Sequence, residues 1–222
     1  MPTSIHASLW RFELPANNHV TFGNNLPGIL SGQAKRGAVL ISHGAGGNMM
    51  TPLLVQTAAG LNEDGFLTLR WSFGYVEAGR APSAGGKKEL PEMAAAVDFL
   101  VERAGNAPVI LLGKSFGGRL STHIAAERAD IAALVLYGLP VRGMGKNPKP
   151  RDWSHLAKIK ADVLFITGDK DKLCPLDELA AAQSHLSKPC QSEVVPGDHS
   201  YKPRGEAAAL HICLSWMLAR SA

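Results

Sequence analysis

Apolar residues along this chain form short runs of strand length that alternate with longer segments of helical periodicity. The expected strands are residues 38–42, 67–71, 108–112, 132–137, 163–167 and 192–195. The expected helices are residues 52–62, 91–103, 116–128, 175–186 and 204–218. This alternation predicts an α/β fold, with a mostly parallel sheet covered by helices on both faces.

The remaining patterning concerns the N-terminal region and the size of the chain. Residues 8–14 and 20–22 predict a leading hairpin, joined by a loose link that contains proline and asparagine. A length of 222 residues suffices for one substantial core, so we expect a single domain over residues 1–222.

One predicted strand runs directly into a serine that lies between glycines, in Gly113-Lys114-Ser115-Phe116-Gly117. A helical pattern follows at once, so the chain must reverse within a residue or two. A β-carbon at position 113 or 117 would collide with the adjoining turn, which explains the glycines. The hydroxyl of Ser115 would stand clear of the sheet at a helix N-terminus, where negative charge is favoured. The pattern predicts a nucleophile elbow; the alternative is a glycine-rich turn with an incidental serine.

A serine nucleophile needs a base and a group that orients the base. His199 follows the last predicted strand, and Asp169 and Asp171 both follow the strand at 163–167. The order serine, aspartate, histidine is that of α/β-hydrolases, and loops after parallel strands emerge at one edge of the sheet. We expect Asp171 to orient His199. Asp169, which can cap the turn through its side chain, is the alternative.

A glycine-rich loop, His43-Gly44-Ala45-Gly46-Gly47-Asn48, follows the strand at 38–42. Such a loop allows main-chain N–H groups to approach a substrate oxygen. We predict an oxyanion hole formed by the amides of Ala45 and Phe116, with Gly44 as the alternative to Ala45. His43 is expected to order the loop rather than transfer protons. A phosphate-binding loop is the competing interpretation, but the loop lacks dinucleotide-binding spacing and a Gly-Lys-Ser/Thr ending.

These motifs resemble those of α/β-hydrolases of the dienelactone-hydrolase-like type, over nearly the whole chain from about residue 38 onward. The stretches His43 to Met49, Gly79-Arg80-Ala81-Pro82 and Gly113 to Arg119 more narrowly resemble bacterial relatives of the testis-expressed protein 30 and NSL-complex subunit 3 group. The resemblance implies a Ser115–His199–Asp171 triad and no particular substrate. Larger relatives insert a lid domain after the strand that follows the elbow helix. The connection 138–152 is too short for one here, so we expect a solvent-open site.

Motifs and resemblance together predict a serine hydrolase of the carboxylesterase type. It would cleave a small carboxylester, thioester or lactone through an acyl-enzyme, without a metal or an organic cofactor. Two alternatives remain: a peptidase on the same fold, and a non-catalytic interaction or scaffold protein, because the narrower group includes scaffolding subunits.

Charge and cysteine content narrow the possible partners and compartments. The formal net charge is +4 and no run of five or six like charges occurs, so nucleic-acid binding is not expected. Three widely spaced cysteines, without a metal or redox pattern, favour a reducing compartment. The sequence shows neither a signal-peptide pattern nor an apolar run of membrane-spanning length, so we expect a cytoplasmic protein without a membrane partner. The expected oligomeric state is a monomer or small homo-oligomer. Arg119, after the elbow, is expected to be a surface or packing cation, with anion recognition as the alternative.

Overall fold

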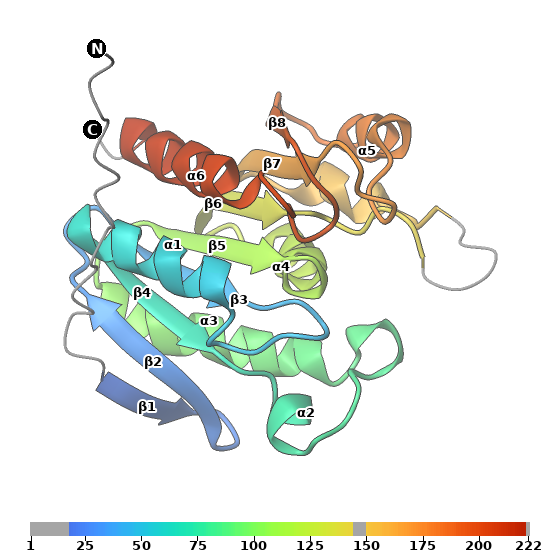
Figure 1. Ribbon diagram of the computed structural model, residues 1–222. Helices are drawn as coiled ribbons and strands as arrows, with labels where there is room; N and C mark the ends of the chain where they lie inside the picture. Colours follow the sequence, from blue (N-terminus) through green and yellow to red (C-terminus); the bar gives the residue numbers. More distant parts are fainter. Residues whose placement is uncertain (1–17, 144–149, 221–222) are drawn as a thin grey trace, which may run out of the picture.

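The structure, a computed structural model, describes residues 18–143 and 150–220 and is built around an eight-stranded sheet (Figure 1). The strands lie in the order β1-β2-β4-β3-β5-β6-β7-β8. They are β1 (Asn18–Phe22), β2 (Leu26–Gly32), β3 (Gly37–Ser42), β4 (Phe66–Trp71), β5 (Val109–Lys114), β6 (Ile131–Tyr137), β7 (Asp162–Gly168) and β8 (Gln191–Val195). The β1–β2 and β2–β4 pairs are antiparallel and all other pairs are parallel. The expected mostly parallel sheet is confirmed.

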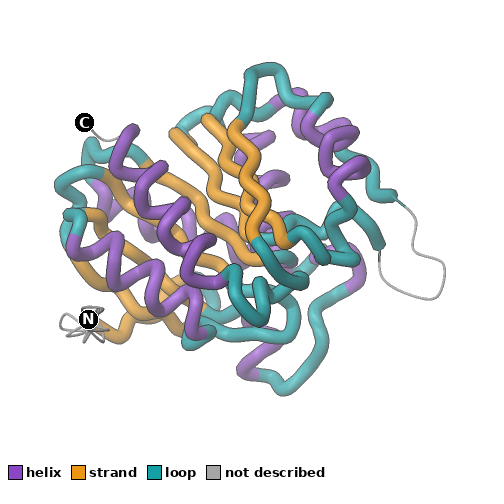
Figure 2. Tube along the Cα trace, turned by 45° about the horizontal axis from the view of Figure 1, so that its top comes forward, coloured by secondary structure: helices purple, strands orange, loops and turns teal. Residues whose placement is uncertain are grey.

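Helices cover both faces of this sheet (Figures 1 and 2). They are α1 (Pro52–Glu63), α2 (Gly74–Glu77), α3 (Glu89–Ala104), α4 (Phe116–Glu127), α5 (Leu176–Gln183) and α6 (Glu206–Arg220), with 3-10 turns η1 (Ala84–Gly86) and η2 (Ser154–Lys158). Buried residues of α3, α4 and α5 belong to one core cluster, and those of α1 and α6 belong to a second cluster. The sheet therefore has one apolar core on each face, as a parallel sheet requires.

The central strand β3 shows how the sequence produces these two cores. All six of its residues are buried. Leu40 belongs to the cluster under α3 and α4, whereas Val39 and Ile41 belong to the cluster under α1 and α6. Successive side chains of a strand point to opposite faces. A continuous apolar run therefore supplies both cores at once.

The N-terminal hairpin differs from the expected one. Residues 8–14 lie outside the described part of the chain, and the hairpin in the structure joins β1 to β2. Residues 26–32 were not expected to form a strand, because Pro27 and Gly28 interrupt the apolar pattern. Packing explains Gly28: a β-carbon there would lie 3.0 Å from Leu69 Cδ1 and 3.1 Å from Phe22 Cε1.

No lid domain interrupts the connection between β6 and β7. In its described part, residues 138–143 and 150–161, the single regular element longer than an isolated bridge is the turn η2. The described part of this connection thus contains no inserted domain, in agreement with its short length in the sequence.

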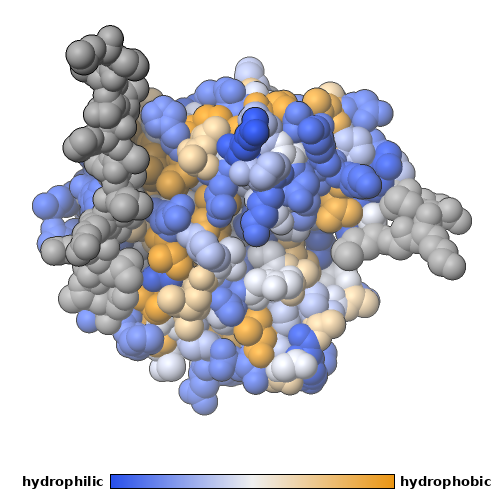
Figure 3. All heavy atoms as spheres, in the orientation of Figure 1, coloured by the Kyte–Doolittle hydropathy of each residue, from blue (hydrophilic) through white to orange (hydrophobic). Residues whose placement is uncertain are grey.

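The visible surface is mostly polar. Figure 3 shows apolar residues in small groups between polar ones. Among described residues, the exposed large apolar side chains are Met50, Leu176 and Val194. None of the helices in the described ranges has both the length and the apolar character that a membrane crossing requires.

Candidate active site

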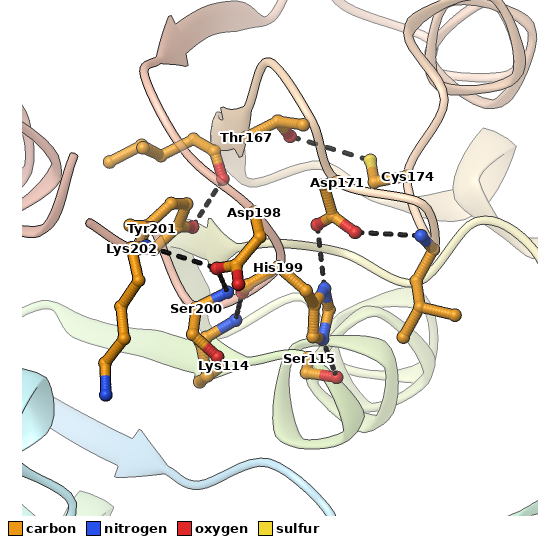
Figure 4. Close-up of polar contacts among 12 residues, drawn as sticks. Lys114, Ser115, Thr167, Asp171, Cys174, Asp198, His199, Ser200, Tyr201 and Lys202 are labelled. Carbon is orange, nitrogen blue, oxygen red and sulfur yellow. Dashed lines mark hydrogen bonds and ion pairs between the residues drawn. The ribbon is translucent and has the colours of Figure 1, made fainter. Parts of the chain in front are cut away.

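Three polar side chains meet where the parallel strands end (Figure 4). Ser115 comes directly after β5, Asp171 comes after β7 and His199 comes after β8. These three strands run parallel within one sheet, so their carboxyl ends lie at the same edge. The topology therefore brings together residues that are up to 84 positions apart in the chain.

Ser115 occupies a strained turn between β5 and α4. Its φ is 51° and its ψ is −111°, a conformation that L-residues with a side chain rarely adopt. The turn is held on both sides: the Ser115 N–H donates to the Tyr137 carbonyl at 2.8 Å, and the Arg119 N–H donates to the Ser115 carbonyl at 2.9 Å. A β-carbon on Gly113 would lie 2.3 Å from the Gly118 nitrogen, and one on Gly117 would lie 2.7 Å from the His43 oxygen. These contacts are the steric reason for the glycines.

The three side chains form a continuous hydrogen-bonded chain. The His199 Nε2 atom lies 2.8 Å from Ser115 Oγ, and His199 Nδ1 lies 2.7 Å from Asp171 Oδ2. The second carboxylate oxygen of Asp171 accepts the Leu173 N–H at 2.8 Å. The Asp171 side chain is fully enclosed, whereas 27% of the His199 side chain is exposed. The carboxylate can therefore orient the imidazole from inside the protein while a substrate approaches from solvent.

Asp169, the alternative acid, does not join this chain. Its Oδ1 atom accepts the Gly197 N–H at 2.7 Å, and its own N–H donates to the Val195 carbonyl at 2.9 Å. These bonds tie the end of β7 to the loop that carries His199. The structure brings together Ser115, His199 and Asp171. Asp169 instead holds the loop that carries His199 against the end of β7.

The glycine-rich loop after β3 lies against the elbow. A β-carbon on Gly44 would be 3.4 Å from Ser115 Cβ, and the Gly117 N–H donates to the His43 carbonyl at 3.1 Å. Phe116 begins α4, so its N–H has no acceptor within the helix. Ala45 is the second residue of a turn closed by the Gly47 N–H on the Gly44 carbonyl at 3.0 Å, and the N–H at that position takes no part in the turn bond. Both predicted amides are thus free of these bonds; Phe116 directly follows the serine, and Gly44, the residue before Ala45, lies beside it.

His43 orients one of these amides. It is completely buried, its Nδ1 lies 2.7 Å from the Gly44 oxygen, and its Nε2 accepts the Phe73 N–H at 3.2 Å. This pattern requires a neutral ring with the proton on Nδ1, and burial lowers the pKa of His43 accordingly. The Gly44 carbonyl and the Ala45 N–H are trans in one planar peptide. Holding the carbonyl on one side therefore directs the N–H to the other.

Lys114 has a contact that the sequence pattern does not predict. Its ammonium group donates to the main-chain carbonyl of His199 (Figure 4). Burial lowers the pKa of Lys114 to about 8, although the negative charge of Asp171 opposes this shift. Gly138, with φ of 55°, leaves room for the group, because a β-carbon there would lie 2.9 Å from Lys114 Nζ and 3.3 Å from Asp171 Oδ2. The feature of the sequence that could have indicated this contact is a lysine at the end of an otherwise apolar strand.

The nearby thiol and the other polar groups suggest no second chemistry. Cys174 is buried, its Sγ lies 3.6 Å from Thr167 Oγ1, and burial raises its pKa to about 12, so it is a thiol at neutral pH. Over residues 18–143 and 150–220, no three His, Cys, Asp or Glu side chains are grouped closely enough to bind a metal ion together.

A family model described as an alpha/beta hydrolase domain matches residues 35–212. This chain belongs to the α/β-hydrolase family. The matched region contains the elbow, both aspartates and His199.

Solved structures of α/β hydrolases share the fold at low sequence identity. Dienelactone hydrolase from Anabaena variabilis has a TM-score of 0.75 and 21% identity, and the match covers 94% of this chain and 99% of that one. A serine hydrolase without a lid from Xanthomonas campestris has a TM-score of 0.71 and 19% identity, with 92% and 94% covered. The esterase domain of a Rhodothermus marinus protein has a TM-score of 0.69 and 17% identity, with 91% and 98% covered. This α/β hydrolase is thus structurally similar to esterases, dienelactone hydrolase and lidless serine hydrolases.

Proposed function

We propose that this α/β hydrolase is a carboxylesterase-type serine hydrolase that cleaves small carboxylesters, thioesters or lactones through an acyl-enzyme. The observation that carries the proposal is the hydrogen-bonded chain from Ser115 through His199 to Asp171. A neutral imidazole that donates through Nδ1 to a carboxylate presents Nε2 as an acceptor for the serine proton. The structural similarity to an esterase domain and to dienelactone hydrolase supports the same substrate class.

In the first half of the reaction, Ser115 Oγ attacks the substrate carbonyl carbon and His199 Nε2 accepts the hydroxyl proton. Asp171 keeps the imidazole in the required tautomer and stabilises the imidazolium. The carbonyl oxygen becomes an oxyanion, for which the amides of Ala45 and Phe116 are the proposed donors; losing one such donor typically lowers turnover about 10²–10³-fold. The tetrahedral intermediate collapses, and His199 gives its proton to the leaving oxygen or sulfur.

In the second half, His199 accepts a proton from water as the water oxygen attacks the acyl carbon. A second tetrahedral intermediate forms at the same amides. Its collapse breaks the bond to Ser115 Oγ, which regains the proton from His199. The acid product leaves and the enzyme returns to its starting state. The proposed reaction therefore needs no cofactor.

Labelling with a fluorophosphonate probe tests the assignment of Ser115. The wild-type protein should react stoichiometrically, and Ser115→Ala should lose all labelling. Ser200→Ala is a matched control, because Ser200 is an exposed serine next to His199 and should leave labelling intact. Circular dichroism checks that each variant is folded.

The outcomes separate the alternatives. Label that persists in Ser115→Ala would show that another residue is the nucleophile. A wild-type protein that neither reacts with the probe nor hydrolyses short p-nitrophenyl esters would favour the non-catalytic interaction protein instead.

A further inference from the structure

A pocket of about 400 Å³ lies beside α4, between that helix and the segment at 150–153. Its lining includes Arg119, His123, Arg151, Asp152 and Trp153. Arg119 is the fourth residue after Ser115, so it lies about one helical turn along α4 from the nucleophile. The pocket therefore lies about one helical turn from the nucleophile, and none of its lining residues belongs to the triad.

Arg119 is a buried cation whose guanidinium has no hydrogen-bond or ion-pair partner among the described residues. It is 9% exposed, and its guanidinium forms no hydrogen bond or ion pair with residues 18–143 or 150–220. Its aromatic contact is the ring of Phe116, with the guanidinium carbon 5.4 Å from the ring centroid. Buried charges in proteins are ordinarily paired, because an uncompensated one is costly. An arginine that lines a pocket and forms no hydrogen bond or ion pair with the described residues indicates a place where an anion could bind.

Neighbouring cations strengthen the positive charge of the pocket. Burial is the main cause of the lowered pKa of Arg119, and the charge of Arg151 lowers it further. Arg151 uses its Nε–H to bond the Pro140 carbonyl at 3.1 Å and forms no ion pair within the described residues. Two arginines thus lie close enough for mutual repulsion, an arrangement that a bound anion would relieve.

The carboxylates near the pocket have other partners. The charge of Glu89 raises the pKa of Arg119, and the hydrogen bonds of this carboxylate go to Ser83, whose N–H it accepts at 2.9 Å and whose hydroxyl it accepts at 2.5 Å. Asp152 accepts the N–H of Ser154 at 2.9 Å and its hydroxyl at 3.1 Å. Neither carboxylate forms an ion pair with Arg119 in the described structure.

His123, which lines the pocket, and its neighbour His155 add little charge at neutral pH. The rings of His123 and His155 are stacked, with centroids 3.9 Å apart. Burial lowers the pKa of both, and the charge of Arg119 lowers each further. The pKa of His155 falls to about 4, with His123 as an additional cause. His123 therefore contributes a neutral part of the pocket wall, and the arginines are the cationic groups of the pocket.

The Arg119 side chain leans toward the end of α4 that carries the nucleophile. Helix side chains lean toward the N-terminus of their helix, which in α4 is the end that carries Ser115. A β-carbon on Gly86 would lie 3.1 Å from Arg119 Nη2 and 3.5 Å from Phe116 Cε2, so the guanidinium lies near the ring of Phe116, the first residue after the nucleophile. An anionic group near Arg119 would therefore be within a short chain length of a carbonyl at Ser115.

We propose that this pocket binds a carboxylate or phosphate group of the substrate. Arg119 is the main residue that contacts the anion, and Arg151 is a second cation. This inference rests on the proposed function and narrows it to esters that carry an anionic group away from the scissile bond. A planar guanidinium suits both anions, because it offers a fork of N–H donors to two oxygens.

A pair of esters of equal chain length tests the inference. Mono-p-nitrophenyl adipate carries a terminal carboxylate, and p-nitrophenyl hexanoate does not. We expect the wild-type kcat/KM to favour the adipate ester about 10- to 100-fold, the range that a charge-assisted hydrogen bond supplies. Arg119→Met should reduce this ratio toward one, and Arg119→Lys should retain part of it. The control is Arg220→Met, which removes one positive charge from α6 on the opposite face of the sheet and should preserve the ratio.

The result also distinguishes failure of the inference from failure of the proposed function. Turnover of both esters without a preference, or a preference that survives Arg119→Met, would overturn the anion pocket and leave the serine hydrolase intact. If the wild type hydrolyses neither ester, calorimetric titration with adipate and with inorganic phosphate decides. Binding of either anion that Arg119→Met abolishes supports the pocket, and comparing the two probes shows which anion it prefers. No binding, or equal binding by wild type and variant, overturns it.

Discussion

At the residue scale, Asp169 and Asp171 carry the same side chain in the same loop but have different surroundings. Asp171 is enclosed and bonded to His199, whereas Asp169 is exposed and bonded to the Gly197 amide. Both satisfy the pattern of an acid after a strand. What separates them is where His199 lies, which depends on β8 pairing with β7. The sequence order predicts the residue types, and the long-range pairing selects between neighbours.

Replacing each aspartate by asparagine should separate the two roles. Asp171→Asn should lower kcat for p-nitrophenyl acetate by about 10⁴-fold, because an amide favours the wrong tautomer of His199. Asp169→Asn keeps an oxygen acceptor for the Gly197 N–H and should leave kcat nearly unchanged. Steady-state kinetics at neutral pH measures both. An equal loss in the two variants would contradict the assignment of the orienting acid.

At the scale of elements, the strands with continuous apolar runs were the predictable ones. The expected strand 38–42 is observed as Gly37–Ser42, and 132–137 is observed as Ile131–Tyr137. β2 was missed because its conformation depends on its neighbours: residues 28–32 pair with β4, a contact that local pattern does not encode. The helix expected at 175–186 is shorter in the structure, Leu176–Gln183, because periodicity alone does not locate a helix end.

The tight turn at the elbow leaves no room for a side chain at Gly113, so a substitution there should destabilise the fold. Gly113→Ala should lower the free energy of unfolding by about 3 kcal/mol or more, because the new β-carbon would overlap backbone atoms of Gly118. Gly46→Ala, in the loop after β3, is the control, since no heavy atom lies within 4 Å of its ideal β-carbon. Urea denaturation should find the control within about 0.5 kcal/mol of wild type. Similar stabilities for the two variants would argue against the tight turn.

At the scale of the whole molecule, Lys114 links distant parts of the fold. It ends β5, its ammonium bonds the loop after β8, and the same group lies 5.0 Å from the centroid of the Tyr201 ring. Burying this charge opposes folding, while its contacts hold the His199 loop in place. Stability and the geometry of the site are therefore coupled through one side chain.

This coupling should appear in the dependence of stability on pH. The pKa of Lys114 falls from 10.5 to about 8 in the folded protein, so between these values the unfolded chain binds more protons. The penalty for the buried charge is fully present below pH 8 and is relieved as the pH rises toward 10.5. The unfolding free energy of wild type should therefore increase relative to that of Lys114→Met over this interval. Parallel urea titrations at pH 7, 8, 9 and 10 measure the difference, with the exposed Lys158→Met as control. A difference that stays flat with pH would show that Lys114 keeps its ordinary pKa.

The order of the three site residues along the chain has a consequence for synthesis on the ribosome. Translation produces Ser115 first, Asp171 later and His199 last, after the final strand β8. A nascent or prematurely terminated chain therefore carries a hydroxyl without its proton acceptor. Under the proposed mechanism, such a chain cannot attack the esters around it, and reactivity begins only when the last part of the sheet has joined the rest.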